Sequence, residues 1–238
     1  MRGVITIWKK EAWTYATSAR WYVLAALMVA FTSLWFWFAN LQEGRQATLA
    51  HIMGLLSFLL MAVTPIFTMR LIAEESNRGT LELLLTSPVR EWQIVLGKFL
   101  GALTAYVAIF AITLLYPAIL MRFAEPDVGP MLAQYAGMFG LSCAFISVGL
   151  FASSVTDSQV LAAVIGYILL FGFWILNWIA EALPGSLQSI GKAASLLAHL
   201  EKFNRGIIDA VDVFYYVAFT AIFLLLSLRF VEARRWAA

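Results

Sequence analysis

Six long apolar runs, almost free of charged residues, dominate this chain of 238 residues. They cover residues 21–39, 52–69, 99–121, 131–156, 160–180 and 213–228. A helix needs about 20 apolar residues to cross the hydrocarbon of a bilayer, and lipid excludes open strands because their backbone amides would lack hydrogen-bond partners. The runs therefore predict an all-α, polytopic membrane protein with six transmembrane helices. The charged fraction of 13% agrees, since soluble domains carry about 25%.

The distribution of Lys and Arg predicts the orientation of the spans. If the N-terminus is cytoplasmic, eleven of the sixteen Lys and Arg residues fall on the inner side. Such an excess is typical of cytoplasmic loops, so we expect both termini in the cytoplasm and the protein in the cell inner membrane. The net charge of +2 is too small and too dispersed to predict a nucleic-acid partner.

Residues 1–20 precede the first span and are expected to form a helix in the headgroup plane of the inner leaflet. Val4, Ile5 and Trp8 belong to its predicted apolar face, whereas Lys10 and Thr14 belong to its polar face. The candidate interfacial residues are Trp8, Lys9, Lys10 and Trp13. The segment lacks the short basic stretch and apolar core of a signal peptide, so we expect the first span to be retained. The pattern leaves open whether the helix is only an anchor.

Segment 70–98 connects the second and third spans and carries the acidic pair Glu74 and Glu75 near its start. A charged side chain at the bilayer centre costs roughly 2.5 to 3.5 kcal/mol on insertion scales, so we expect this pair at the inner boundary of the membrane or beyond it. Gly79 is expected to break the helix, and Thr80 to cap a short amphipathic helix that follows.

The end of the same segment predicts a turn and a new helix, with Ser87 as cap and Pro88 at its first position. A short helix fixed between two spans would act as a lever, because a push on it moves both spans. The alternative is a solvated loop with an interfacial turn.

Motifs for nucleotide binding and catalysis are missing from this sequence. Gly97-Lys98 and Gly191-Lys192 both lack the upstream glycine of a phosphate-binding loop. We therefore predict no catalytic residue, metal site or cofactor in this chain. His51 and His199 are expected at the outer side in hydrogen-bonding roles. The spans contain almost no ionisable residue, which disfavours an ion-coupled carrier.

Gly97 and Gly101 form a pair of small residues one helical turn apart at the start of the third span. Such pairs allow two helix backbones to approach closely. The spacing predicts a tight helix contact, either within one chain or across a dimer.

Two stretches resemble a known family. The first is Glu74-Glu75-Ser-Asn-Arg78-Gly79-Thr80-Leu-Glu82, continuing to Pro88 and followed by Ile94-Val-Leu-Gly97-Lys98-Phe. It resembles the loop after the second span of ABC-2 type transporter permeases. The second stretch, from His199 to Tyr216, is similar to the segment before the last span in one subgroup. That subgroup contains the gliding-motility permease and the permease for maturation of nitrous oxide reductase.

The resemblance implies that segment 70–98 holds a coupling helix, which docks on a cytoplasmic ABC ATPase. The ATPase is a separate chain and would carry the ATP and Mg. The matching residues are Glu74, Glu75, Arg78, Gly79, Thr80 and Glu82. The resemblance also implies a dimer, of two copies or with a paralogous permease. Segment 181–212 would form short external re-entrant helices, with the candidate residues His199, Phe203, Arg205, Gly206 and Asp209.

Together these features predict a single transmembrane permease domain over residues 1–238. It would export an amphipathic or lipid-linked substrate, or drive an envelope partner, with energy from the ATPase. Membrane lipid is an expected partner, and a further periplasmic or membrane subunit stays open. The alternatives are a self-sufficient secondary transporter or channel without ATPase, and a membrane scaffold without transport. The sequence does not specify the substrate or the direction of transport.

Overall fold

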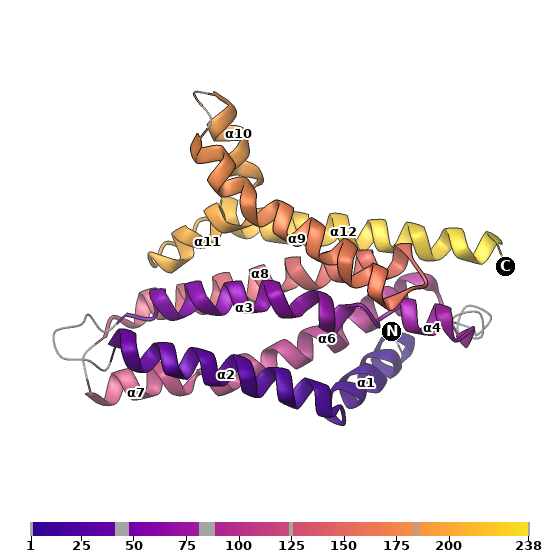
Figure 1. The fold of residues 1–238 in the computed structure, drawn as a ribbon, viewed down its shortest axis with the longest axis horizontal. Helices are drawn as coiled ribbons and strands as arrows, with labels where there is room; N and C mark the ends of the chain where they lie inside the picture. The colour runs from indigo at the N-terminus through magenta and orange to yellow at the C-terminus, as the bar shows by residue number, and fades with distance from the viewer. Residues whose placement is uncertain are drawn as a thin grey trace.

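The computed structural model describes residues 2–40, 48–80, 89–123, 126–182, 184 and 186–237. Throughout these ranges the regular structure is helical, without a strand. Six helical segments there are long and apolar enough to cross a membrane: Ala19–Asn40, Ala50–Asn77, Glu91–Phe123, Val128–Val155, Gln159–Ala182 and Ala210–Arg234. This confirms the predicted all-α, polytopic membrane fold with six spans (Figure 1).

One helix, α8 (Val128–Val155), lies at the centre of the bundle. The spanning helices packed on it are α3 (Ala50–Thr68), α6 (Glu91–Thr113), α9 (Gln159–Ala182) and α12 (Ala210–Ala237), while α2 (Ala19–Asn40) lies on α3 and α6. The short helix α11 (Leu196–Asn204) also packs on α8. Glycines let the neighbours approach: a Cβ at Gly149 would lie 2.1 Å from Thr68 Oγ1, and one at Gly140 would lie 3.0 Å from Tyr216 Cδ2. Small residues of this kind mark tight helix contacts in membranes.

The third span is made of two helices. Its first part, α6, ends at Thr113, and α7 (Leu115–Phe123) follows after a break at Leu114. Pro117 has no N–H to donate to the carbonyl of Thr113. Tyr135 of α8 donates its hydroxyl to that carbonyl instead, at 2.8 Å. The carbonyl of Thr113 therefore keeps a hydrogen-bond partner despite the break.

The start of α6 differs from the expectation. The helix begins at Glu91 rather than at Pro88, because Arg90 has an extended backbone with φ −81° and ψ 148°. The side chain of Gln93 accepts a hydrogen bond from the backbone N–H of Arg90 at 3.1 Å, which fixes this start. Ser87 and Pro88 themselves lie outside the described residues.

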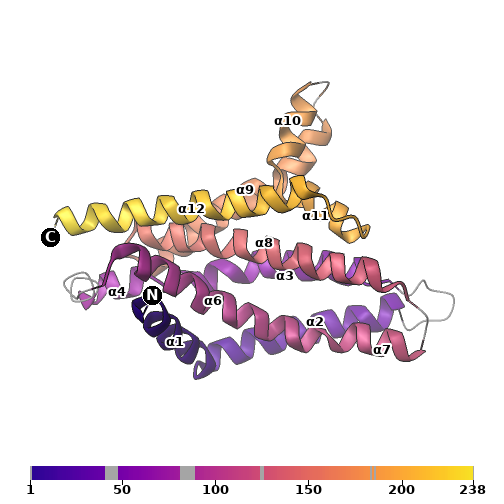
Figure 2. The same cartoon turned by 180° about the vertical axis from the view of Figure 1, so that it is seen from behind.

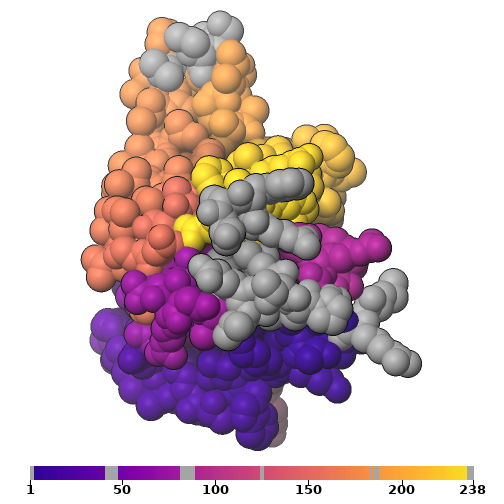
Figure 3. All heavy atoms as spheres, turned by 90° about the vertical axis from the view of Figure 1, so that its right-hand side faces the viewer, coloured from indigo at the N-terminus to yellow at the C-terminus, as the bar shows by residue number. Residues whose placement is uncertain are grey.

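Both termini lie at one end of the long axis, together with α4 (Ala73–Asn77), as Figures 1 and 2 show. Seen end on in Figure 3, the indigo N-terminal helices, the purple region of α4 and the yellow C-terminal helix share this face. The N-terminal helix is α1 (Arg2–Ala16), which packs along the first part of α6. Between α9 and α12 the chain forms α10 (Ser186–Ala194) and α11 (Leu196–Asn204). The two termini thus share one side, and its assignment to the cytoplasm stays a prediction.

Candidate functional site

A single hydroxyl fixes the turn between α3 and α4. Ser153 of α8 accepts hydrogen bonds from the backbone N–H groups of Ile72 and Ala73, both at 3.0 Å. The same hydroxyl donates to the carbonyl of Met69 at 3.1 Å. The entry to α4 is therefore bound to the central helix.

Glycine ends α4 as the sequence predicts. Gly79 has a φ of +68°, a conformation that glycine adopts without steric strain and that commonly terminates helices. The hydroxyl of Thr80 donates to the carbonyl of Glu75 at 3.2 Å, so this side chain closes the end of α4. Its expected role as the cap of a following helix concerns residues 81–88, which lie outside the described ranges.

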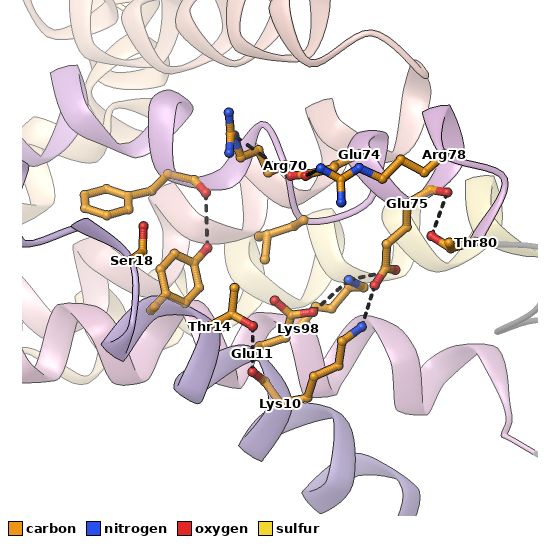
Figure 4. Close-up of a pocket in the computed structure, with 13 residues that line it drawn as sticks. Lys10, Glu11, Thr14, Ser18, Arg70, Glu74, Glu75, Arg78, Thr80 and Lys98 are labelled. Carbon is orange, nitrogen blue, oxygen red and sulfur yellow. Dashed lines mark hydrogen bonds and ion pairs between the residues drawn. The ribbon is translucent and has the colours of Figure 1, made fainter. Parts of the chain in front are cut away.

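A charge network, formed by Glu11, Lys98, Glu75 and Lys10, joins α4 to α1 and α6 (Figure 4). The Glu75 carboxylate lies 2.8 Å from Lys98 Nζ and 3.0 Å from Lys10 Nζ. Lys98 also contacts Glu11 at 3.0 Å, and its side chain is only 2% exposed. Each of the four groups therefore has an opposite charge beside it, as buried charges require.

The position of α1 is set by the two glycines of α6. A Cβ at Gly97 would lie 2.8 Å from Ile7 Cβ, and one at Gly101 would lie 2.4 Å from Glu11 Cβ. The tight contact predicted from these glycines is thus made within one chain. Ile7 and Glu11 thus face α6 at these two glycines. Ile5, which was predicted on the apolar face, points away from α6 and is 46% exposed.

The remaining interfacial candidates lie on two sides of α1. Trp8 donates from Nε1 to Thr104 Oγ1 of α6 at 2.8 Å. Lys9 is exposed, and Trp13 is 71% exposed. One side of α1 therefore packs on α6, while the other side is exposed and can face lipid headgroups.

The last helix also reaches α4. Ser76 donates its hydroxyl to Asp157 Oδ1 at 2.6 Å, and Arg234, near the end of α12, pairs with Asp157 and contacts Ser76. The hydrogen bonds from Ser76 and Arg234 hold the pKa of Asp157 below its usual range, against a small opposing effect of burial. Through these contacts α4 is bonded to the turn between α8 and α9 and to α12.

Electrostatics favour the charged form of Lys10. Burial opposes that form, but the hydrogen bond to Glu75 and the negative charges of Glu75 and Glu11 raise the pKa of Lys10 above its usual value. Burial raises the pKa of the neighbouring Tyr15, whose hydroxyl donates to the carbonyl of Phe67 at 3.1 Å. The Lys10 ammonium thus stays charged at neutral pH.

The predicted coupling residues fall into two groups. Glu74 and Glu75 are half-buried and bind within the chain, Glu74 to Arg78 at 2.7 Å and Glu75 to the charge network. Arg78, Gly79 and Thr80 are exposed at the tip of α4. Glu82 lies outside the described residues.

The outer candidates gather around His199 on α11. Its Nδ1 lies 2.5 Å from Asp212 Oδ1 and its Nε2 lies 3.1 Å from the carbonyl of Ala193, so a protonated ring can donate to both. Asp212 is fully buried and also accepts from Lys202 at 3.1 Å, a hydrogen bond that raises the pKa of Lys202. The ring of Tyr215 stacks on that of His199, with centroids 3.9 Å apart. This cluster binds α10, α11 and α12 together.

Packing or helix-end contacts explain three of the other candidates in segment 181–212. Phe203 packs on Gly137, where a Cβ would lie 2.5 Å from Phe203 Cβ. Gly206 ends α11 with a φ of +83°, and Asp209 accepts from the backbone N–H of Val211 at 3.1 Å at the start of α12. Arg205 is exposed. Whether segment 181–212 re-enters the membrane stays a prediction.

Sequence reasoning missed five residues that position α4: Glu11, Lys98, Ser153, Asp157 and Arg234. Two features of the sequence could have identified Glu11 and Lys98. Glu11 follows Val4 and Ile7 at helical spacing on the buried stripe of α1, and Lys98 lies between the glycines of α6. A lysine in a close helix contact needs a carboxylate partner. In the described part of the chain, no cluster of three His, Cys, Asp or Glu residues could hold a metal ion.

Comparisons with known proteins show the family of the chain. A family model described as "ABC-2 family transporter protein" matches residues 23–231. The chain is 29% identical over 160 residues to "Probable ABC transporter permease protein NosY" of Pseudomonas aeruginosa, which covers 60% of this chain and 57% of that protein. It is 33% identical over 88 residues to "Probable multidrug ABC transporter permease YbhR" of Escherichia coli K12, which covers 37% and 23%. The chain therefore aligns with less than two thirds of the length of these relatives.

Proposed function

Because the chain belongs to the ABC-2 transporter family, we propose that it is the transmembrane permease of an ABC transporter and takes its energy from a separate ATPase chain. One observation carries the proposal: α4 presents an exposed tip at the end of the bundle and is bonded to α1, α6, α8 and α12. A displacement of this tip would reach helices from the beginning, middle and end of the chain.

The two groups of coupling residues suggest two roles. Arg78, Gly79 and Thr80, together with Glu82, would contact the ATPase, because the described three are exposed at the tip. Glu75 would transmit the movement to α1 and α6 through Lys10 and Lys98. In this proposal ATP and Mg bind to the ATPase, and the permease works as a dimer.

The proposed cargo is an amphipathic or lipid-linked molecule, or an envelope partner that is driven without a solute. The spans are mostly apolar, and the charge network is confined to the contacts between α1, α4 and the first part of α6. The name of the relative YbhR refers to multidrug transport, which is compatible with an amphipathic cargo.

Charge reversal at the tip of α4 tests the proposal. Arg78 and Arg229 are both exposed and both pair with a glutamate on their own helix, so Arg229→Glu is a matched control for Arg78→Glu. We expect Arg78→Glu to reduce co-purification of the ATPase chain, while Arg229→Glu leaves it unchanged. Glu75→Lys should keep the ATPase bound but uncouple its ATP hydrolysis from the permease. Equal co-purification and activity in all variants, or solute flux in liposomes without ATP, would contradict the proposal.

A further inference from the structure

A cavity of about 600 Å³ opens beside the charge network, at the end of the bundle that carries both termini. Its walls come from α1, the end of α3 with the turn that follows, α4 and α6. Figure 4 shows the polar part of these walls. Transmission through the charge network does not require a hollow here, so the cavity needs a separate explanation.

Most charges around the cavity are already paired. Among the described residues that line it are the cations Lys10, Arg70, Arg78 and Lys98 and the carboxylates Glu11, Glu74 and Glu75. Glu11 and Glu75 bind Lys98, and Glu74 binds Arg78 at 2.7 Å. Four cations against three carboxylates leave an excess of positive charge.

Arg70 is the weakest-paired cation of this set. Its Nε lies 3.9 Å from Glu74 Oε2, which is beyond hydrogen-bonding distance. That nitrogen is buried and has no hydrogen-bond partner in the described structure, a state that costs free energy. Nε itself is closed off, but the side chain as a whole is 39% exposed and lines the cavity, so a ligand there can reach other atoms of Arg70. An anionic oxygen in the cavity would give this guanidinium a closer partner than Glu74 does.

Part of the cavity wall is apolar. Tyr15, Phe67 and Leu71 line it, with the rings of Tyr15 and Phe67 6.1 Å apart. The cavity lies where α3 ends at Thr68 and beside α1, whose exposed Trp13 is typical of the membrane interface. A positive group next to an apolar wall at this depth matches the two parts of a phospholipid, its phosphate and the beginning of its acyl chains.

We propose that this cavity binds the phosphate group of an anionic phospholipid of the inner leaflet, with Arg70 as its main ligand. The bound lipid would touch both α1 and α4 and so help to hold α4 in place. Free phosphate offers the same anionic oxygens without acyl chains. The proposal stands whether or not an ATPase docks on the tip of α4.

Thermal unfolding of the purified, delipidated chain in detergent tests this site. The probes are short-chain phosphatidylglycerol, short-chain phosphatidylcholine and inorganic phosphate. A ligand that binds the folded state raises the unfolding temperature in proportion to the logarithm of its concentration. We expect phosphatidylglycerol to raise it in the wild type and far less in Arg70→Gln. The matched control Arg229→Gln, which removes an exposed cation of α12, should respond like the wild type.

The other outcomes are equally specific. An equal response of Arg70→Gln and the wild type would overturn the site, and an equal effect of phosphatidylcholine would overturn the preference for an anionic lipid. If inorganic phosphate protects as well as phosphatidylglycerol, the lipid assignment is wrong. Native mass spectrometry of the unmodified chain, taken from a mixed bilayer, does not depend on any variant folding. Preferential retention of phosphatidylglycerol supports the proposal, and equal retention of the two lipids contradicts it.

Discussion

At the scale of single residues, Lys98 is the most constrained group near α4. Its ammonium lies 2% exposed between the carboxylates of Glu11 and Glu75. A buried ion pair adds little stability over an apolar pair, but removal of one partner leaves an uncompensated charge. Lys98 compensates two carboxylates at once, so its loss should be more costly than the loss of either acid.

Replacement of the lysine tests this. We expect Lys98→Met to destabilise the protein by about 3 to 5 kcal/mol, seen as a large drop in the unfolding temperature in detergent. Glu75 keeps its ion pair with Lys10, so Glu11 is the carboxylate that this variant leaves unpaired. Adding Glu11→Gln removes that charge and should restore part of the loss. A Lys98→Met protein that unfolds at the wild-type temperature would show that the charge network does not form.

At the scale of elements, α1 is part of the bundle and not only an anchor on the membrane. The glycines at positions 97 and 101 let it approach α6 until Ile7 and Glu11 touch the helix backbone. This contact places Lys10 and Glu11 within reach of α4 and Lys98. The amphipathic pattern predicted the helix. The face of α1 that packs on α6 was not predictable from that pattern, because it depends on the positions of Gly97 and Gly101 on α6.

An added methyl group tests the packing of α1 on α6. A Cβ at Gly101 would meet Glu11 Cβ at 2.4 Å, while Gly172 on α9 has open space around it. Overpacking costs about 1 to 3 kcal/mol, so Gly101→Ala should lower the unfolding temperature. The control Gly172→Ala should leave it unchanged or raise it, because alanine favours helix more than glycine does. Equal behaviour of the two variants would place α1 elsewhere.

The contact between α12 and α4 should depend on pH. The pKa of Asp157 is lower in the folded protein than its ordinary value, which is about 3.9. Its ion pair therefore contributes stability at neutral pH and loses it as the pH falls through the lowered pKa. The pair is exposed to solvent, so its contribution is at most about 1 kcal/mol.

Hydrogen exchange at residues 73–77 measures this effect. Asp157→Asn should exchange faster than the wild type at pH 7, and the difference should shrink only as the pH falls below about 3.9 and through the lowered pKa of Asp157, where the wild-type carboxylate also becomes neutral. A difference of the same size at both pH values would mean that the charge of Asp157 is not what holds α4.

At the scale of the whole molecule, the sequence was sufficient to predict an all-α membrane fold with six spans. Runs of apolar residues give the spans because the bilayer sets their length, and the family resemblance pointed to the segment around Glu75. The contacts that fix α4 were not predictable in the same way. Ser153, Asp157 and Arg234 are remote in sequence from α4 and follow no local pattern. The fold alone brings them together.

The most direct test of the account is site-specific photocrosslinking from the exposed tip of α4. A photoreactive residue at Asn77 should crosslink to the nucleotide-binding chain in membranes that contain the whole transporter. The same residue at Arg122, in the last turn of α7 and at the other end of the bundle (Figure 1), should not. Crosslinking to the ATPase from Arg122 and not from Asn77 would contradict the central claim that α4 receives the force.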